Sequence, residues 1–459
     1  MHSSPPRSTP SAASWPHPAT AAGLPVDPAS AARTKEDPNP SPPQQASQAF
    51  HAATPAGAPR LPTTTLSTDA DGTPAVRLLA DTLLEAARRD ASDLHIEPAE
   101  QGWRIRLRVD GVLHEMARPP AHLCDAFITR VKVLARLDIA ERRVPQDGRL
   151  RLTVAPGRIE DYRVNSLPTL HGEKLVLRRL EALPATLSLA TLGLDARQRD
   201  TVDAAIRAPH GLILVTGPTG SGKTLSLYCF LQMLNAESRN VCTVEDPAEI
   251  QLAGLNQVSV RQQAGLTFAV ALRAFLRQDP DVIMVGEIRD EETADVAVKA
   301  AQTGHLVLST LHTNDAPAAI ARLLDIGVEP YNLAAALRMV TAQRLVRKLC
   351  TACREPANES AAALRAAGFA EDHADGWHPY ASRGCAACHR IGYRGRIGVH
   401  QVMPVSDTTR ELIIARAGTH AVAKQAGSEH VATLREAALA RVRDGTTSLA
   451  EALAATEVA

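Results

Sequence analysis

Aromatic residues are scarce in this sequence of 459 residues, which holds 6 Phe, 3 Trp and 5 Tyr. Stacking of single-stranded nucleic acid on aromatic side chains therefore has little to build on. Neither sign of charge is in excess, because 50 Lys and Arg balance 50 Asp and Glu. This balance argues against a surface coated in basic residues for nucleic acid, although it leaves room for a local basic patch.

Long apolar runs and a secretory leader are also missing from the sequence. No stretch of about 18 apolar residues occurs, which argues against a membrane-spanning helix. The first thirty residues lack a basic segment followed by an apolar one, so no secretory signal is visible. From these absences, and from a length that fits about two to four domains, we expect a soluble, intracellular, multidomain protein.

The N-terminal segment differs in composition from the rest of the chain. Residues 1–74 hold 15 of the 31 prolines, mixed with Ser, Thr and Ala. Proline removes amide donors, and a segment with few branched apolar residues cannot bury enough surface to offset its ordering entropy. We predict a disordered Pro/Ser/Ala-rich tail, with a docking segment that orders on a partner as the alternative.

Regular patterning begins after the tail. Residues 76–98 start with apolar side chains at helical spacing, and residues 103–109 alternate apolar and polar side chains as in a half-buried strand. Asp110-Gly111 then supplies a tight hairpin turn. With further strand-like segments, residues 75–185 are expected to form a small α+β domain, and residues 183–194 a linker.

Short apolar strands alternate with helical stretches from there on, which predicts a doubly wound, mostly parallel sheet. We assign residues 186–345 to this core, 346–400 to a cysteine-bearing insert and 401–459 to C-terminal helices. The expected strands lie within GLILVTG (211–217), RNVCTVEDP (239–247), DVIMVGE (281–287) and HLVLSTLHT (305–313).

The strongest motif follows the first of these strands and precedes a helix. Its eight residues, all candidates for nucleotide binding, are Gly217, Pro218, Thr219, Gly220, Ser221, Gly222, Lys223 and Thr224. The glycines let backbone amides approach phosphate oxygens, and the helix N-terminus favours negative charge. Lys223 supplies charge to the β- and γ-phosphates, and the Thr224 hydroxyl can bind Mg²⁺. A chance glycine-rich turn is the alternative.

Acidic residues follow two later strands. Glu245 and Asp246 end one strand, and Glu287 ends another. The carboxyl ends of parallel strands face the ligand crevice, so both groups can reach a γ-phosphate. A solvated cap is the alternative for each taken singly, and the presence of both at strand ends after a phosphate loop disfavours it.

Two histidines flank a third strand. His305 precedes the apolar run and His312 follows it. A histidine here can sense the γ-phosphate or orient a catalytic water, and the alternative for either is a structural role.

At these residues the chain resembles the secretion ATPases that power type II secretion and type IV pilus assembly. EDPAE looks like the aspartate box of that family, DVIMVGE its Walker B region and TGHLVLSTLHTNDA its histidine box. The motifs that carry the resemblance are ASDLHIEP (91–98), RVDG (108–111), QDGR (146–149), SLPTLHGEKLVLR (166–178), GPTGSGKT (217–224), EDPAE (245–249), ALRAFLRQDPDVIMVGEIRDEETADVA (271–297) and TGHLVLSTLHTNDA (303–316).

The resemblance implies an α/β fold with a RecA-like P-loop domain, and a homohexameric motor that hydrolyses ATP with Mg²⁺. Glu245 and Glu287 then divide water activation and Mg²⁺ organisation between them, with Glu287 and Thr224 as metal ligands. Arg149 and Arg163 match positions from which this family brings arginines toward the phosphates, although each also fits an ordinary solvated strand arginine.

The resemblance further implies a polytopic inner-membrane platform protein as partner, indirect action on pilins or pseudopilins, and peripheral association with the cytoplasmic face of the inner membrane. The chain departs from the family in two places. The tail stands where members usually carry a folded docking domain, and Gln401 stands where glutamate is commoner.

Four of the seven cysteines form two Cys-x-x-Cys pairs. These are Cys350 with Cys353 and Cys385 with Cys388, and four such thiolates suit tetrahedral Zn²⁺. Disulfides are the alternative, disfavoured in a reducing compartment. His389 stands beside one pair as a substitute ligand. Cys124, Cys229 and Cys242 fit ordinary small buried residues.

Two other functions use the same phosphate chemistry. A DNA-uptake or DNA-translocating motor would need a basic channel, which the balanced charge does not favour. A regulator that binds nucleotide without hydrolysis is opposed by the intact acidic residues. We expect no direct contact with nucleic acid.

Overall fold

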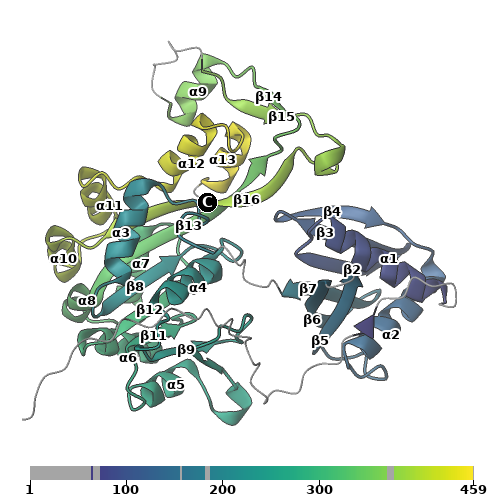
Figure 1. Cartoon of the computed structure of the whole chain (residues 1–459), viewed down its shortest axis with the longest axis horizontal. Helices are drawn as coiled ribbons and strands as arrows, with labels where there is room; N and C mark the ends of the chain where they lie inside the picture. The colour runs from purple at the N-terminus through teal and green to yellow at the C-terminus, as the bar shows by residue number, and fades with distance from the viewer. Residues whose placement is uncertain (1–63, 66–72, 156–157, 181–186, 370–376, 458–459) are drawn as a thin grey trace, which may run out of the picture. The chain divides into compact units, whose positions relative to one another are not determined.

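A computed structural model describes residues 64–65, 73–155, 158–180, 187–369 and 377–457 of the chain (Figure 1). The predicted disordered tail falls almost entirely outside these ranges. Among the described helices, none combines the length and the hydropathy that crossing a lipid bilayer requires.

The first part of the described chain is a seven-stranded sheet with two helices. The strands lie in the order β1-β5-β6-β7-β2-β3-β4, and all neighbours are antiparallel except β1 and β5. The elements are β1 (Thr64–Thr65), α1 (Pro74–Arg88), β2 (Asp93–Ala99), β3 (Gly102–Val109), β4 (Val112–Ala117), η1 (Ala121–Leu123), α2 (Cys124–Leu134), β5 (Gln146–Ala155), β6 (Arg158–Thr169) and β7 (Gly172–Leu180).

Strand β3 shows why the sequence folds this way. Its alternate residues from Trp103 to Val109 are buried, and Trp103 packs on Phe127 of α2 with ring centroids 5.1 Å apart. Asp110 and Gly111 both have positive φ, 48° and 88°, as the two-residue turn between β3 and β4 requires. The predicted half-buried strand and its hairpin are therefore confirmed.

The second part is built on another seven-stranded sheet, in the order β10-β9-β11-β12-β8-β13-β16, parallel at every pair but the last. Its elements up to the cysteine region are α3 (Ala196–Ile206), β8 (Gly211–Thr216), α4 (Lys223–Leu234), β9 (Val241–Glu245), β10 (Asn256–Ser259), η2 (Gln262–Ala264), α5 (Phe268–Phe275), β11 (Val282–Val285), α6 (Glu291–Gln302), β12 (Leu306–Leu311), α7 (Ala316–Ile326), α8 (Pro330–Ala336) and β13 (Leu337–Leu349).

Helices cover both faces of this second sheet (Figure 1). Leu212 and Leu214 of β8 join the apolar cluster that includes α5 to α8, whereas Ile213 and Val215 join the cluster with α3 and α4. Every residue of β8 is buried. A strand covered on both sides must be continuously apolar, which is why its sequence lacks alternation. The expected doubly wound α/β fold is confirmed.

Two long antiparallel strands carry the cysteine region. β13 pairs with β16 from Met339–Pro404 to Leu349–Tyr393, so both strands run across the limits of 345 and 400 expected for the insert. Polar residues such as Gln343, Arg344 and Arg347 interrupt the apolar pattern of β13, and this hid the strand in the sequence. The remaining elements are β14 (Arg354–Pro356), α9 (Ala361–Ala367), β15 (Tyr380–Ser382), η3 (Ala386–Cys388), β16 (Tyr393–Pro404), α10 (Asp407–Ile414), α11 (Thr419–Ser428), α12 (Leu434–Arg443) and α13 (Leu449–Ala455).

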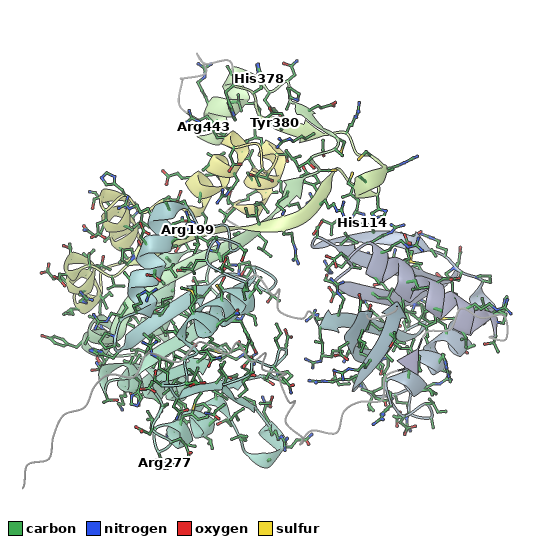
Figure 2. All side chains as sticks on the ribbon, in the orientation of Figure 1. His114, Arg199, Arg277, His378, Tyr380 and Arg443 are labelled. Atoms are coloured by element: carbon green, nitrogen blue, oxygen red, sulfur yellow. The ribbon has the colours of Figure 1, made fainter. Side chains whose placement is uncertain are left out.

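The cysteine region is tied to the C-terminal helices by polar contacts. Arg354 lies over the ring of Tyr380, 5.2 Å from its centroid, and donates to the Gly445 carbonyl at 3.1 Å. Trp377 donates to the carbonyl of Arg443, which closes α12, at 2.8 Å. Tyr380 and Arg443 are labelled in Figure 2.

A buried ion pair holds the first sheet to α2. Lys132, only 1% exposed, donates to a Glu173 carboxylate oxygen at 2.8 Å and to the Glu141 carbonyl at 2.7 Å. Arg142 also lies near Glu173, but at 4.0 Å, so the buried carboxylate depends mainly on Lys132 for its counter-charge.

Replacing Lys132 by Met should therefore lower the free energy of unfolding by up to about 3–5 kcal/mol, since it removes the close partner of the buried Glu173 and leaves Arg142, 4.0 Å away, as its nearest described cation. Adding Glu173→Leu should restore most of the loss. Lys299→Met is the control, because Lys299 and Asp295 form an exposed i,i+4 pair worth about 0.5 kcal/mol or less. Chemical denaturation followed by tryptophan fluorescence measures all three; equal losses for Lys132→Met and Lys299→Met would contradict the prediction.

Candidate active site

The glycine-rich loop lies between β8 and α4, as predicted. Gly217 and Gly222 have φ of 147° and 88°, in the range where glycine is favoured. A Cβ on Gly217 would lie 2.4 Å from the carbonyl oxygen of Gln343, and one on Gly222 would lie 2.8 Å from its side-chain nitrogen. Gln343 of β13 thus closes the back of the loop, and only glycine fits against it.

Lys223, the first residue of α4, folds over this loop. Its Nζ donates to the carbonyls of Gly217 at 2.8 Å and Pro218 at 3.1 Å. Burial lowers the pKa of Lys223 to about 8, with a smaller contribution from Arg344 and opposition from Glu287. A cation this poorly solvated gains from phosphate oxygens as partners.

Two hydroxyls of the loop complete its chemistry. Ser221 Oγ is buried and has no hydrogen-bond partner among the described residues, so it can donate to a phosphate oxygen. Thr224 is exposed at the start of α4, where its hydroxyl can hold Mg²⁺. The loop therefore fits the phosphates of a nucleoside triphosphate.

His312 connects Lys223 to Glu287. Its Nδ1 is 3.5 Å from Lys223 Nζ, and its Nε2 is 3.5 Å from Glu287 Oε2. A lysine ammonium can only donate, so Nδ1 accepts and the ring proton lies on Nε2, toward Glu287. Burial, then Lys223, lowers the pKa of His312, which keeps the ring neutral near pH 7. The structure thus brings together three of the predicted residues.

Glu245 occupies a separate, buried environment at the end of β9. It accepts hydrogen bonds from Tyr228 at 2.6 Å, Thr243 at 2.7 Å and Gln257 at 3.3 Å. β9 and β11 are parallel neighbours, so Glu245 and Glu287 both lie at the carboxyl ends of adjacent strands. Sequence reasoning missed Tyr228 and Gln257, since neither belongs to an acidic or glycine-rich motif.

His305 lies at the amino ends of the parallel strands, on the side of the sheet opposite to the phosphate loop. It precedes β12, and its Nδ1 is 3.0 Å from the Ala300 carbonyl oxygen. The expected phosphate-sensing role therefore has no support for His305, which caps the end of α6.

Gln401, the residue that stands where the family more often has glutamate, accepts a hydrogen bond from the Ala316 amide at 2.9 Å, at the start of α7.

Arg149 and Arg163 belong to the first sheet, where they are directly paired across β5 and β6. The next pair in the same row is Arg163 with Arg178 of β7, and Arg178 donates to Asp93 at 2.9 Å. Arg163 also donates to Asp147 at 3.4 Å, so two of these three arginines on successive strands already have carboxylate partners. Strand register alone reveals Arg178, which no sequence motif singled out.

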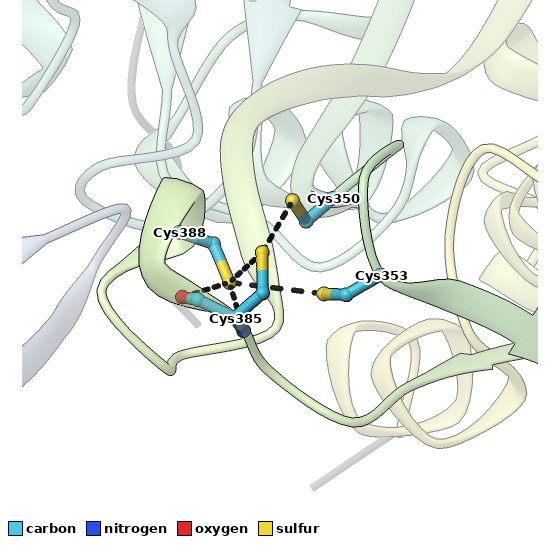
Figure 3. A group of neighbouring side chains, drawn as sticks. All are labelled: Cys350, Cys353, Cys385 and Cys388. Carbon is cyan, nitrogen blue, oxygen red and sulfur yellow. Dashed lines mark hydrogen bonds between the residues drawn. The ribbon is translucent and has the colours of Figure 1, made fainter.

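The four predicted cysteines converge (Figure 3). Their sulfurs lie within 4.8 Å of one another, with Cys350–Cys385 at 3.9 Å and both Cys353–Cys388 and Cys385–Cys388 at 3.8 Å. Four sulfurs at about 2.3 Å from one tetrahedral Zn²⁺ are about 3.8 Å apart. The donor set therefore fits zinc, and among the described residues this group does not include His389.

Backbone amides support the same sulfur cluster. The amides of Cys385 and Gly392 both lie 3.2 Å from Cys388 Sγ and donate to it. Such bonds stabilise a thiolate, the form in which cysteine binds a metal. Of the other cysteines, Cys229 and Cys242 are buried, whereas Cys124 is half-buried.

A strand, a glycine-rich loop and a helix, with acidic residues at the carboxyl edge of a parallel sheet, define a P-loop nucleotide hydrolase. Residues 68–454 match the model of the family described as type II/IV secretion system protein. The chain belongs to this family, and it is an ATPase.

The chain is also similar to individual members with known names. It is 48% identical over 383 residues to the type IV pilus assembly ATPase PilB of Myxococcus xanthus, covering 83% of this chain and 68% of that protein. It is 47% identical over 387 residues to the type II secretion system ATPase E of Vibrio cholerae, covering 84% and 76%. A solved structure of the pilus retraction motor PilT with bound ADP matches 83% of this chain and 97% of its own, with 26% identity and a TM-score of 0.55.

The lowered pKa of Lys223 predicts how ATP binding depends on pH. The ammonium is charged below about pH 8 and loses its proton above it in the free protein. Phosphate favours the charged form, so affinity should be full below about pH 8 and fall by up to about tenfold per pH unit above it. Equilibrium titration with a fluorescent ATP analogue between pH 7 and 9.5 measures this.

Lys223→Arg is the matched control, because a guanidinium stays charged throughout this range. Whatever its absolute affinity, the variant should lose the dependence above pH 8. A wild-type affinity that does not change with pH would count against the prediction.

Proposed function

We propose that this protein is a homohexameric motor that couples ATP hydrolysis to the assembly of pilins or pseudopilins by a type II secretion or type IV pilus machine. The observation that carries the proposal is the meeting of Lys223, His312 and Glu287 at the carboxyl edge of the sheet. The near-half identity to assembly ATPases of both machines supports it.

The proposed catalytic roles follow from the surroundings of each side chain. Lys223 and the loop amides bind the β- and γ-phosphates, and His312, which lies between Lys223 and Glu287, senses the γ-phosphate. Glu287 and Thr224 would hold Mg²⁺, which would neutralise phosphate charge. Glu245 accepts a proton from the attacking water while the water oxygen bonds to the γ-phosphorus and the bond from that phosphorus to the β,γ-bridging oxygen breaks, giving ADP and phosphate.

Arg149 and Arg163 supply positive charge for the transferred phosphoryl group, which Lys223 and the carboxylates alone do not complete. In this proposal Arg149 and Arg163 stabilise the negative charge that develops on the transferred phosphoryl group. They lie on a different sheet from Lys223, so ATP can bridge the two sheets and hydrolysis can release them. Neighbouring copies in a ring would then complete each other's sites.

The proposal keeps the expected order of domains and the expected partners, with the ends of β13 and β16 that cross residues 345 and 400 belonging to the core sheet. Residues 75–185 carry the arginines, 186–345 the phosphate loop, 346–400 the metal and 401–459 the supporting helices. The motor acts on the cytoplasmic face of the inner membrane through a polytopic platform protein, for which residues 1–74 are a candidate docking segment.

Alanine at Arg149 or Arg163 should lower kcat for ATP by about 10³-fold, the range measured for arginines that stabilise phosphoryl transfer. Phosphate release by the full chain with Mg²⁺ measures this. Arg143→Ala is the control, because Arg143 is an 88% exposed arginine paired with Glu141. Unchanged turnover in both Arg149→Ala and Arg163→Ala would sink the proposed role.

The same assay separates the other two functions. A DNA motor would show turnover that rises with double-stranded DNA and falls steeply with salt, whereas we expect no response to DNA. A regulator that only binds nucleotide would release no phosphate.

We also propose that the four cysteines hold one structural Zn²⁺, since four thiolates leave no open coordination position. The purified chain should contain about one zinc per molecule by mass spectrometry of the metal. Replacing Cys385 and Cys388 by Ser should remove it and expose the segment after Cys353 to limited proteolysis, whereas Cys242→Ala should keep the metal. A zinc-free wild-type chain that resists proteolysis equally well would overturn this assignment.

A further inference from the structure

Helix α4 connects the phosphate loop with the surroundings of Glu245. It begins with Lys223, which covers the phosphate loop, and five residues later it presents Tyr228, which is fully buried. Five residues of α-helix span about 7.5 Å along the axis. One rigid element therefore sets the separation between the phosphate-binding lysine and whatever Tyr228 contacts.

Tyr228 contacts Glu245. Its Oη lies 2.6 Å from Glu245 Oε2 and 3.0 Å from the Ile250 carbonyl oxygen. A phenol has one proton to donate, and the shorter contact to a charged oxygen is the stronger one. The Ile250 carbonyl already accepts from Gln257 Nε2 at 2.9 Å, so it does not depend on the phenol.

The other donors around Glu245 leave a single acceptor position open. A carboxylate has about four acceptor positions. Thr243 and Gln257 both donate to Oε1, and Tyr228 donates to Oε2. The open position therefore lies on Oε2, the oxygen that Tyr228 holds. Glu245 is only 5% exposed, so bulk water has little access to this carboxylate.

We propose that Tyr228 is a positioning residue for catalysis, which orients Glu245 so that its one open acceptor position takes the attacking water. The inference rests on the proposed role of Glu245 and extends it to a residue outside every nucleotide-binding motif. Because α4 carries both Lys223 and Tyr228, movement of the phosphate loop on nucleotide binding would reach Glu245 through this helix.

The phenol is suited to this task because it stays protonated. Burial, and then the hydrogen bond to Glu245, raises the pKa of Tyr228 far above its ordinary value. Tyr228 thus remains a neutral donor at every pH at which the protein is folded, and it does not compete with Glu245 for the proton of the water.

Tyr228→Phe removes only the phenolic oxygen and tests the proposal in the full chain. We expect kcat for ATP to fall about 10- to 100-fold, the loss typical of a misoriented catalytic group, while KM changes by less than about twofold because the phosphate loop is intact. Cys229→Ala, at a buried neighbour on the same helix, is the matched control and should leave kcat and KM within about twofold of wild type.

A double-mutant cycle separates positioning from general support of the fold. If Tyr228 acts through Glu245, adding Tyr228→Phe to Glu245→Gln should lower kcat by less than about twofold further. An equal loss in both backgrounds, or a matching rise in KM, would mean a structural role and overturn the proposal.

Two results distinguish this inference from the function on which it depends. Wild-type kcat in Glu245→Gln would remove the role proposed for Glu245, and the inference with it. Loss of activity in Glu245→Gln together with wild-type kcat in Tyr228→Phe would overturn the inference alone and leave the proposed function standing.

Discussion

The burial of the Lys223 ammonium is the constraint on which the site depends. A cation removed from water needs acceptors, and here two carbonyls of its own loop serve, at 2.8 and 3.1 Å. They can do so because Gly217 and Gly222 adopt positive φ and bring the loop close against Gln343. Phosphate oxygens are better acceptors for a lysine than peptide carbonyls, so the fold holds this charge ready for an anion.

The parallel sheet converts this local arrangement into a site. Neighbouring parallel strands end on the same side of the sheet, so residues that follow β8, β11 and β12 meet although up to about a hundred residues separate them. This is why the acidic groups and His312 could be placed near the phosphate loop from the sequence, and why His305, at the start of its strand, is excluded from it. Local pattern together with one topological rule was sufficient for Glu287 and His312, whereas the pattern alone had left His305 as a candidate.

Features that depend on register or on long-range packing were not accessible in this way. Arg178 joins Arg149 and Arg163 only because of how β6 pairs with β7, and no local pattern encodes that pairing. β13 was hidden because polar side chains that serve the loop interrupt its apolar run. Tyr228 reads in the sequence as a core aromatic, since the contact that distinguishes it is with a residue on another element.

The cysteine cluster and the phosphate site differ in how many of their polar groups already have partners within the protein, and this difference distinguishes their roles. At the cysteines four sulfurs face one another at tetrahedral spacing, and backbone amides support them, so nothing is left for a substrate. The phosphate site retains unused capacity: Ser221 Oγ has no partner among the described residues, and Glu245 has one acceptor position free. Buried polar groups left partly unpaired are costly, and they persist where a ligand completes them. A closed centre therefore stabilises the fold, whereas an incomplete one is where chemistry on a bound nucleotide takes place.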